Sequence, residues 1–235
     1  MENTLKKTIF IRTTASLVLA AALASCGGGT SMYTIKGVVY NLQPGTELIL
    51  TTNGMEKVIK QEQPADAQGN VPAISYAFPN QLEYGEVYNV LPKQIGEDPA
   101  TKTPIYQWPA HQTCSPTTTG RISDTAGRLT EIHADYACSL NSHSIGGFVT
   151  GLTTGSSVTL LNGTSGGEIK VDAPATPPES GKVTFTFSQA VTWNSTYGVT
   201  VKASDKVDCT VINGAGRMGD EPVADIEVRC VPKPS

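Results

Sequence analysis

Five cysteines are the residues of this 235-residue sequence whose type and spacing point most clearly to chemistry. Cys26 stands alone near the N-terminus, whereas the other four form two local pairs, Cys114 with Cys138 and Cys209 with Cys230. A cysteine thiol forms a disulfide, ligates a metal or carries a covalent modification, depending on its surroundings. The lone cysteine and the paired cysteines are therefore expected to serve different purposes.

The N-terminus joins a basic stretch to an apolar one. Lys6, Lys7 and Arg12 come before an apolar run over residues 15–24. This run is too short for a spanning helix, which needs ~20 apolar residues to cross ~30 Å of hydrocarbon. Basic residues followed by a short apolar core are typical of an export signal. We therefore predict that residues 1–25 are a signal peptide, which is cleaved off.

The residues that end this signal, Leu23-Ala24-Ser25-Cys26, resemble the lipobox of bacterial lipoproteins. The resemblance implies that Cys26 carries diacylglycerol and a fatty acid such as palmitate, so that the membrane is a partner of the chain. An ordinary signal peptide cut near Ala24 is the alternative. Residues 26–32 then form a flexible, glycine-rich tether. Gly27 stands where Asp tends to retain lipoproteins at the inner membrane, and we therefore expect the outer membrane of a Gram-negative bacterium.

The charge of the exported part is mildly acidic. Residues 1–25 contain Lys6, Lys7, Arg12 and Glu2, and without them 14 basic and 20 acidic residues remain, a formal charge of −6. Proteins that bind nucleic acid usually carry a basic patch, because phosphate contacts dominate that binding. The composition therefore predicts no nucleic-acid partner.

An internal repeat predicts the domain organisation. Residues 33–42 align without a gap on residues 143–152, at an offset of 110, and residues 74–78 align on 183–187, at an offset of 109. Each half then ends in a pair of cysteines. We therefore predict two copies of one domain, over residues 33–139 and 143–235. Chance similarity between β-rich segments is the alternative.

The fold class follows from alternation of apolar and polar residues, which is typical of strands, and from the lack of a 3.6-residue period after the signal. About seven short strands per copy predict an all-β chain of two tandem Ig-like β-sandwiches. The strands expected in the second copy cover residues 144–150, 156–161, 168–171, 182–188, 198–203, 208–212 and 223–231.

Both copies resemble an Ig-like β-sandwich repeat of secreted bacterial proteins, which ends in a cysteine pair. The second copy keeps nine residues of that pattern, namely Gly147, Val149, Gly151, Leu152, Tyr197, Val199, Val201, Cys209 and Cys230. The first copy departs from it, since Asn41 replaces the second glycine. The resemblance implies a module of surface or cell-envelope proteins and supplies no catalytic residues.

The four remaining cysteines are expected to form two disulfides, because exported proteins fold in an oxidising compartment. We predict the local pairs Cys114–Cys138 and Cys209–Cys230. Pairing across the two domains is one alternative. Metal ligation is another, for which His111 and Cys114 would be the candidates.

An insertion over residues 96–110 distinguishes the first copy from the second. Its three prolines are incompatible with a central strand, so we predict a projecting loop. Tyr106 and Trp108 are candidate recognition residues on this loop, because aromatic side chains supply contact area at low entropic cost. In the alternative interpretation, both rings fold back and cover the end of the sandwich.

The sequence contains few candidates for catalysis or metal binding. None of the common nucleophile, phosphate-binding or zinc-protease motifs occurs. We expect His111, His133 and His143 to be structural or exposed. The acidic residues Asp220, Glu221 and Asp225 are a weak calcium candidate, and solvated charge is the expected alternative.

We therefore expect no cofactor, no metal and no enzymatic activity, and interpret the chain as a membrane-anchored binding or scaffold module with a protein or glycan partner in the cell envelope. The alternative is an enzyme with an unrecognised site at the domain junction, near Asn141.

Overall fold

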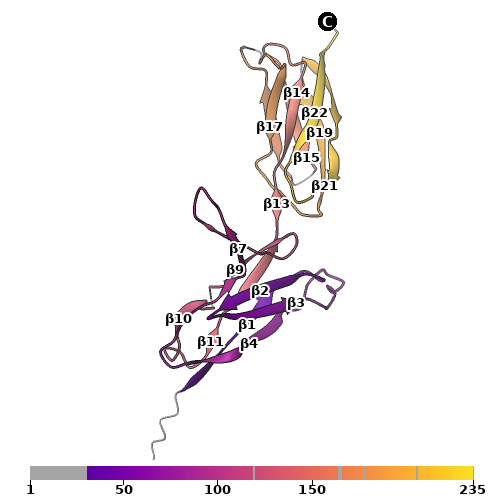
Figure 1. Ribbon diagram of the computed structural model, residues 1–235. Helices are drawn as coiled ribbons and strands as arrows, with labels where there is room; N and C mark the ends of the chain where they lie inside the picture. The colour runs from indigo at the N-terminus through magenta and orange to yellow at the C-terminus, as the bar shows by residue number, and fades with distance from the viewer. Residues whose placement is uncertain (1–30, 119, 164–165, 177, 205, 235) are drawn as a thin grey trace, which may run out of the picture.

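The computed structural model describes residues 31–234 except 119, 164–165, 177 and 205. The expected signal peptide and Cys26 lie outside the described residues, and so does most of the tether. The described chain is all-β and contains no helix. It forms Ig-like β-sandwiches in tandem, which follow one another end to end (Figure 1). The predicted fold class is thus confirmed.

The first sandwich packs one sheet of five strands against a sheet of three. The strands of the larger sheet are β1 (Met32–Tyr40), β4 (Ile74–Glu83), β9 (Gln112–Pro116), β11 (Ile132–His133) and β12 (Tyr136–Leu140). The smaller sheet contains β2 (Glu47–Thr52), β3 (Met55–Lys60) and β6 (Leu91–Pro92). Two short strands, β5 (Val87–Asn89) and β10 (Ser123–Thr125), pair separately.

The second sandwich packs two sheets of four strands. One contains β14 (Ile145–Thr150), β17 (Lys182–Thr186), β20 (Val207–Ile212) and β22 (Val223–Pro232). The other contains β15 (Ser157–Asn162), β16 (Glu168–Asp172), β19 (Thr196–Ser204) and β21 (Ala215–Arg217). The short strands β13 (Ser142–His143) and β18 (Val191–Thr192) pair where the chain enters this sandwich.

The strands predicted for the second sandwich agree with β14–β17, β19, β20 and β22 to within a few residues. Three short strands of two or three residues each, β13, β18 and β21, were not predicted from the sequence. Such short strands carry too little alternation to be recognised, because their pairing depends on the partner strand rather than on their own pattern.

The same order of strand pairs occurs in both sandwiches. In the first, β1 pairs antiparallel with β4 and parallel with β12, which pairs antiparallel with β9. In the second, β14 pairs antiparallel with β17 and parallel with β22, which pairs antiparallel with β20. The register agrees as well, because Gly37 lies opposite Tyr76 and Gly147 opposite Phe185.

Glycine occupies one matching position in these two sheets because a neighbouring backbone comes too close for a side chain. A Cβ on Gly37 would lie 2.2 Å from the carbonyl oxygen of Ala134, and one on Gly147 would lie 1.8 Å from that of Ile226. Both distances are far below van der Waals contact. The close approach therefore requires glycine at both positions.

Asn41, where the first half departs from the repeat pattern, has the backbone conformation of its glycine counterpart. Asn41 has a φ of 57° and Gly151 a φ of 77°. Asparagine tolerates this left-handed region better than other residues with a side chain, so the substitution preserves the turn after the first strand.

Each sandwich has its own hydrophobic core, formed by side chains on alternate positions of facing strands. The pattern is regular in β15, where Val158, Leu160 and Asn162 are buried and the residues between them are half-buried. The described apolar core residues form one cluster within residues 35–138 and another within residues 145–230. Each sandwich is therefore stabilised mainly by its own buried side chains.

Candidate functional site

The paired cysteines form disulfides between neighbouring antiparallel strands. Cys114 on β9 lies opposite Cys138 on β12, and their Cα atoms are 3.9 Å apart. Cys209 on β20 lies opposite Cys230 on β22, at a Cα distance of 4.0 Å. The bonds join the residues that the sequence analysis paired. Both link the last strand of a sandwich to the strand beside it.

The insertion in the first half forms a projecting β-hairpin. Its strands are β7 (Gln94–Glu97) and β8 (Pro104–Tyr106), and Figure 1 shows the hairpin extending away from the sheets. The predicted projection is therefore present, although part of the insertion is strand rather than loop. Pro104 is compatible with this ribbon because it is the first residue of its strand, where a missing N–H is tolerated.

Asp98 organises the tip of this β7–β8 hairpin. Its carboxylate accepts hydrogen bonds from the backbone N–H groups of Ala100 and Thr101, both at 2.8 Å. The hydrogen bond from Thr101, and after it the bond from Ala100, holds the pKa of the Asp98 carboxyl below its usual value. They stabilise a tight turn in which Lys102 has a φ of 59°. The tip is thus ordered by its own polar contacts.

Tyr106 and Trp108 lie at the base of the hairpin and are half-buried rather than exposed. Their rings meet edge to face, with centroids 5.9 Å apart, and Trp108 packs against the core of the first sandwich. This placement corresponds to the alternative in which the rings cover the sandwich. The exposed apolar side chains of the hairpin are instead Ile95, 62% exposed, and Ile105, 45% exposed.

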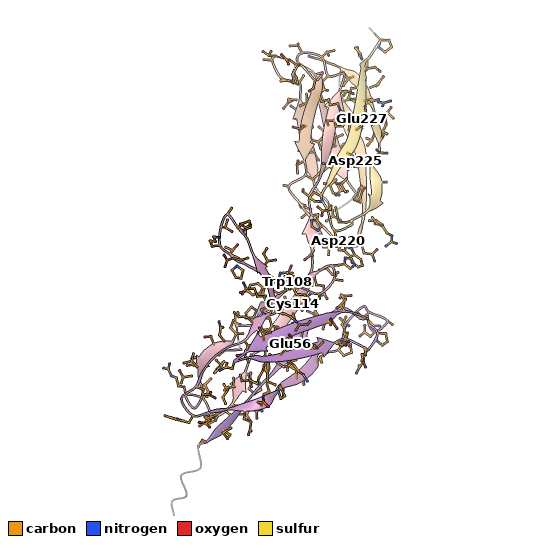
Figure 2. The ribbon with its side chains drawn as sticks, viewed as in Figure 1. Glu56, Trp108, Cys114, Asp220, Asp225 and Glu227 are labelled. Atoms are coloured by element: carbon orange, nitrogen blue, oxygen red, sulfur yellow. A yellow bond between two sulfur atoms is a disulfide. The ribbon has the colours of Figure 1, made fainter. Side chains whose placement is uncertain are left out.

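The junction between the sandwiches is built around His111. Its Nδ1 lies 2.6 Å from a carboxylate oxygen of Asp220, a residue of the second sandwich. The His111 ring also stacks on Trp193, with centroids 3.9 Å apart and planes inclined by 12°. Figure 2 shows Asp220 at the end of the second sandwich that faces Trp108 and Cys114.

The backbone of Asn141 completes this junction. The N–H of Asn141 donates to the carbonyl oxygen of His111, and its own carbonyl accepts from the N–H of Trp193, at 2.9 and 2.8 Å. The Asn141 side chain accepts a hydrogen bond from the Thr113 hydroxyl. The connecting residue is therefore bonded to both sandwiches. In this structure the polar groups near Asn141, where an enzymatic site was the alternative, join the two sandwiches.

The other candidate residues do not form a site. His133 pairs with Glu131 on the surface, and His143 is half-buried on β13. Asp220 pairs with His111. Among the described residues, no group of three or more His, Cys, Asp or Glu is arranged to hold a metal ion. The described residues also include no helix long and apolar enough to cross a membrane.

Sequence reasoning missed the roles of Trp193 and Asp220. Trp193 follows a strand of only two residues, and Asp220 was considered only as a member of an acidic group. His111 and Asp220 are separated by 109 residues, and nothing in the local pattern of either residue indicates the other.

The sequence matches no protein-family model and no curated protein. Several solved structures are similar. The Bacillus anthracis TIE protein has 13% identity and a TM-score of 0.37, and the match covers 85% of this chain and 34% of that one. The Streptococcus pyogenes T-13 major pilin has 10% identity and a TM-score of 0.30, covering 87% and 98%. The D295N mutant of the Lactobacillus rhamnosus GG shaft pilin SpaA has 9% identity and a TM-score of 0.26, covering 87% and 100%.

The chain thus spans about a third of the length of the TIE structure. The fold assignment rests on the strand pairing and the two hydrophobic cores described above.

Proposed function

We propose that the protein is a lipid-anchored, non-catalytic scaffold of the cell envelope, which presents the β7–β8 hairpin to a partner protein. The observation that carries this proposal is the end-to-end arrangement of the sandwiches, with the start of β1 at the end of the first sandwich that is remote from the second (Figure 1). If Cys26 is lipidated, the first sandwich lies next to the membrane and the second extends away from it.

The junction supports the rigidity that such a scaffold needs. His111 contacts the side chains of Trp193 and Asp220, and Asn141 is bonded to both sandwiches. A linker that makes several directional contacts on each side restricts the angle between the domains more than a flexible glycine-rich linker does. The hairpin and the second sandwich therefore keep a defined relative position.

The two sandwiches, over residues 33–139 and 143–235, are proposed to be copies of one domain. The equal order of strand pairs, the glycines at matching positions and the disulfide in each last strand support this origin. Two copies in series extend the protein about twice as far from the membrane as one copy would. They do so without a larger single core, which would be harder to build in a short chain.

The disulfides support an export route, since such bonds persist in oxidising compartments and are rare in the cytosol. The proposed location is thus the cell envelope. The outer membrane of a Gram-negative bacterium is the finer proposal, and it depends on Gly27 alone.

The anchor is tested by labelling cells with radioactive palmitate. The full-length protein is expected to incorporate the label, and Cys26→Ser is expected to lose it, because the thioether requires the thiol. A label that persists in Cys26→Ser would reject the anchor. As a control for folding, digests made without reduction should contain both disulfides in both proteins.

Recognition by the hairpin is tested with Ile95→Ser/Ile105→Ser. Crosslinking in cells is expected to capture an envelope protein with the native chain and to lose it with this double variant. The matched control is Val231→Ser, which changes a side chain of similar exposure, 60%, in β22 of the second sandwich. Equal capture by the double variant and the native chain would refute the role of the hairpin.

The aromatic pair requires a separate variant. Trp108→Ala is expected to lower the melting temperature, because Trp108 packs on the core and its removal leaves a cavity. An unchanged melting temperature together with lost crosslinking would instead restore Tyr106 and Trp108 as the contact residues.

A further inference from the structure

The end of the first sandwich where β1 begins carries a group of exposed apolar side chains. They are Met32, Tyr84, Val87 and Leu129, whose exposed fractions are 47%, 69%, 67% and 39%. We call them the proximal apolar patch. They come from the start of β1, the turn after β4, the start of β5 and the loop that follows β10.

Backbone contacts place these segments side by side. The N–H of Tyr84 donates to the carbonyl of Ser31, which precedes Met32, and Val87 lies opposite Thr125 in the β5–β10 pair. The N–H of Gly85 donates to the carbonyl of Ala126.

The loop after β10 closes the group. A Cβ on Gly127 would lie 2.3 Å from the Tyr84 ring, so this loop runs directly against that side chain. Thr130, the residue after Leu129, lines a groove of about 250 Å³ together with Met32. The segments that carry the four exposed side chains therefore lie together at one end of the first sandwich.

Exposed apolar side chains are concentrated at this end of the first sandwich. Among the described residues, nine large apolar side chains are exposed, and four of them belong to the patch. Single exposed apolar residues are ordinary, but a contiguous group of them usually marks an interaction surface. We therefore expect another surface to cover the proximal apolar patch.

The length of the tether identifies that surface. Six residue steps separate Cys26 from Met32, and a fully extended chain covers at most ~20 Å in six steps. The end of the first sandwich at Met32 therefore stays within ~20 Å of a lipid on Cys26. We infer that the proximal apolar patch rests in the interface of the membrane to which Cys26 is anchored, an inference that depends on the proposed anchor.

The polar groups around the patch suit a lipid surface. Tyr84, the tyrosine of the patch, combines an apolar ring with a hydroxyl group. Side chains of this type are enriched at membrane interfaces. Arg128 is exposed beside Leu129 and pairs with Asp124 at 3.3 Å, while Glu83 and Glu86 flank Tyr84. Because both signs of charge are present, the contact needs no anionic lipid. A zwitterionic surface is the expected occupant.

The contact is tested by hydroxyl-radical footprinting of the lipidated protein in phosphatidylcholine vesicles. The reference is the Cys26→Ser chain without residues 1–25, free in solution. Oxidation of Met32 and Tyr84 is measured relative to Tyr40, which is 41% exposed at the other end of β1 and corrects for radicals consumed by lipid. We expect both ratios to fall at least threefold on anchoring. Equal ratios in the two samples would overturn the inference.

A pair of variants tests the cause of this protection. In lipidated Tyr84→Ser/Val87→Ser, the protection of Met32 should be lost, whereas the matched change of the exposed hairpin residues, Ile95→Ser/Ile105→Ser, should preserve it. Circular dichroism verifies that both variants are folded. Retained protection in the first variant would show that the patch does not hold this end on the membrane.

Two further outcomes separate this inference from its premises. If mass spectrometry finds no diacylglycerol on Cys26, the anchor itself is rejected, and the membrane contact with it. If lipid is present and protection grows with protein density at constant lipid, a second copy of the chain covers the patch, and the membrane contact is overturned while the anchor stands.

Discussion

Gly147→Ala is expected to destabilise the second sandwich strongly, although it adds one methyl group. Gly147 lies in β14, between β17 on one side and β22 on the other. A Cβ at this position would come within 1.8 Å of the carbonyl oxygen of Ile226 in β22. Since carbon and oxygen normally approach no closer than ~3.2 Å, the strands would have to separate by more than ~1 Å at this point.

The surroundings of Ile226 determine how costly this separation is. β22 is held on its far side by six register pairs with β20 and by the disulfide between Cys209 and Cys230, so it cannot simply move away. Overpacking in a well-packed interior costs about 1–3 kcal/mol, and an immovable backbone neighbour places this site at the upper end. For a domain of this size, a loss of ~3 kcal/mol corresponds to a fall of roughly 12–24 °C in melting temperature.

The measurement is urea and thermal unfolding of the Cys26→Ser chain without residues 1–25, followed by circular dichroism. Gly37→Ala should destabilise the first sandwich in the same way, since its Cβ would lie 2.2 Å from the Ala134 carbonyl oxygen. Gly198→Ala is the control, because no described atom lies within 4 Å of a Cβ at that strand position. If Gly147→Ala were as stable as the control, the close approach of β14 and β22 would be wrong.

Three further outcomes follow from the structure. Cys209→Ala/Cys230→Ala should lower the free energy of unfolding by ~3 kcal/mol, the chain-entropy value for a loop of this length, and an unchanged urea midpoint would show that the bond contributes nothing. The pKa of Asp98 is lowered by its backbone hydrogen bonds, so its contribution to the hairpin tip is complete above the unfolded pKa of ~3.9 and is lost as the pH falls through the folded value. The protection of the Ala100 amide, measured by NMR as its exchange rate relative to that of an unstructured peptide at the same pH, should therefore fall only in that acidic range. A loss of this protection near neutral pH would contradict the assignment. Tyr88→Phe should leave the melting temperature unchanged or raise it slightly, because the buried Tyr88 hydroxyl has no hydrogen-bond partner among the described residues, whereas a clear loss of stability would indicate a partner.

Alternation in the sequence was sufficient to predict the main strands of the second sandwich, but not their order within the sheets. The alignment that placed Gly37 on Gly147 and residues 74–78 on 183–187 agrees with the structure, in which Gly37 lies opposite Tyr76 and Gly147 opposite Phe185. The agreement is expected for two similar sheets, because a slip by one residue would expose the whole buried face of a strand. The cysteine pairs were predicted from their local grouping and the expected oxidising compartment, and in the structure each pair lies across two antiparallel strands.

The exposed surfaces and the contact between the two sandwiches depend on the tertiary structure. Ile95 lies in the β7–β8 hairpin and Trp108 follows it, but only the fold shows that the tryptophan packs on the core and the isoleucine faces solvent. The contact of His111 with Asp220 depends on the angle between the two sandwiches, to which no local pattern is sensitive. The proximal apolar patch likewise joins residues from four separate segments. Local alternation indicates which side of a strand is buried. Contacts between turns and between domains instead depend on residues far apart in the sequence.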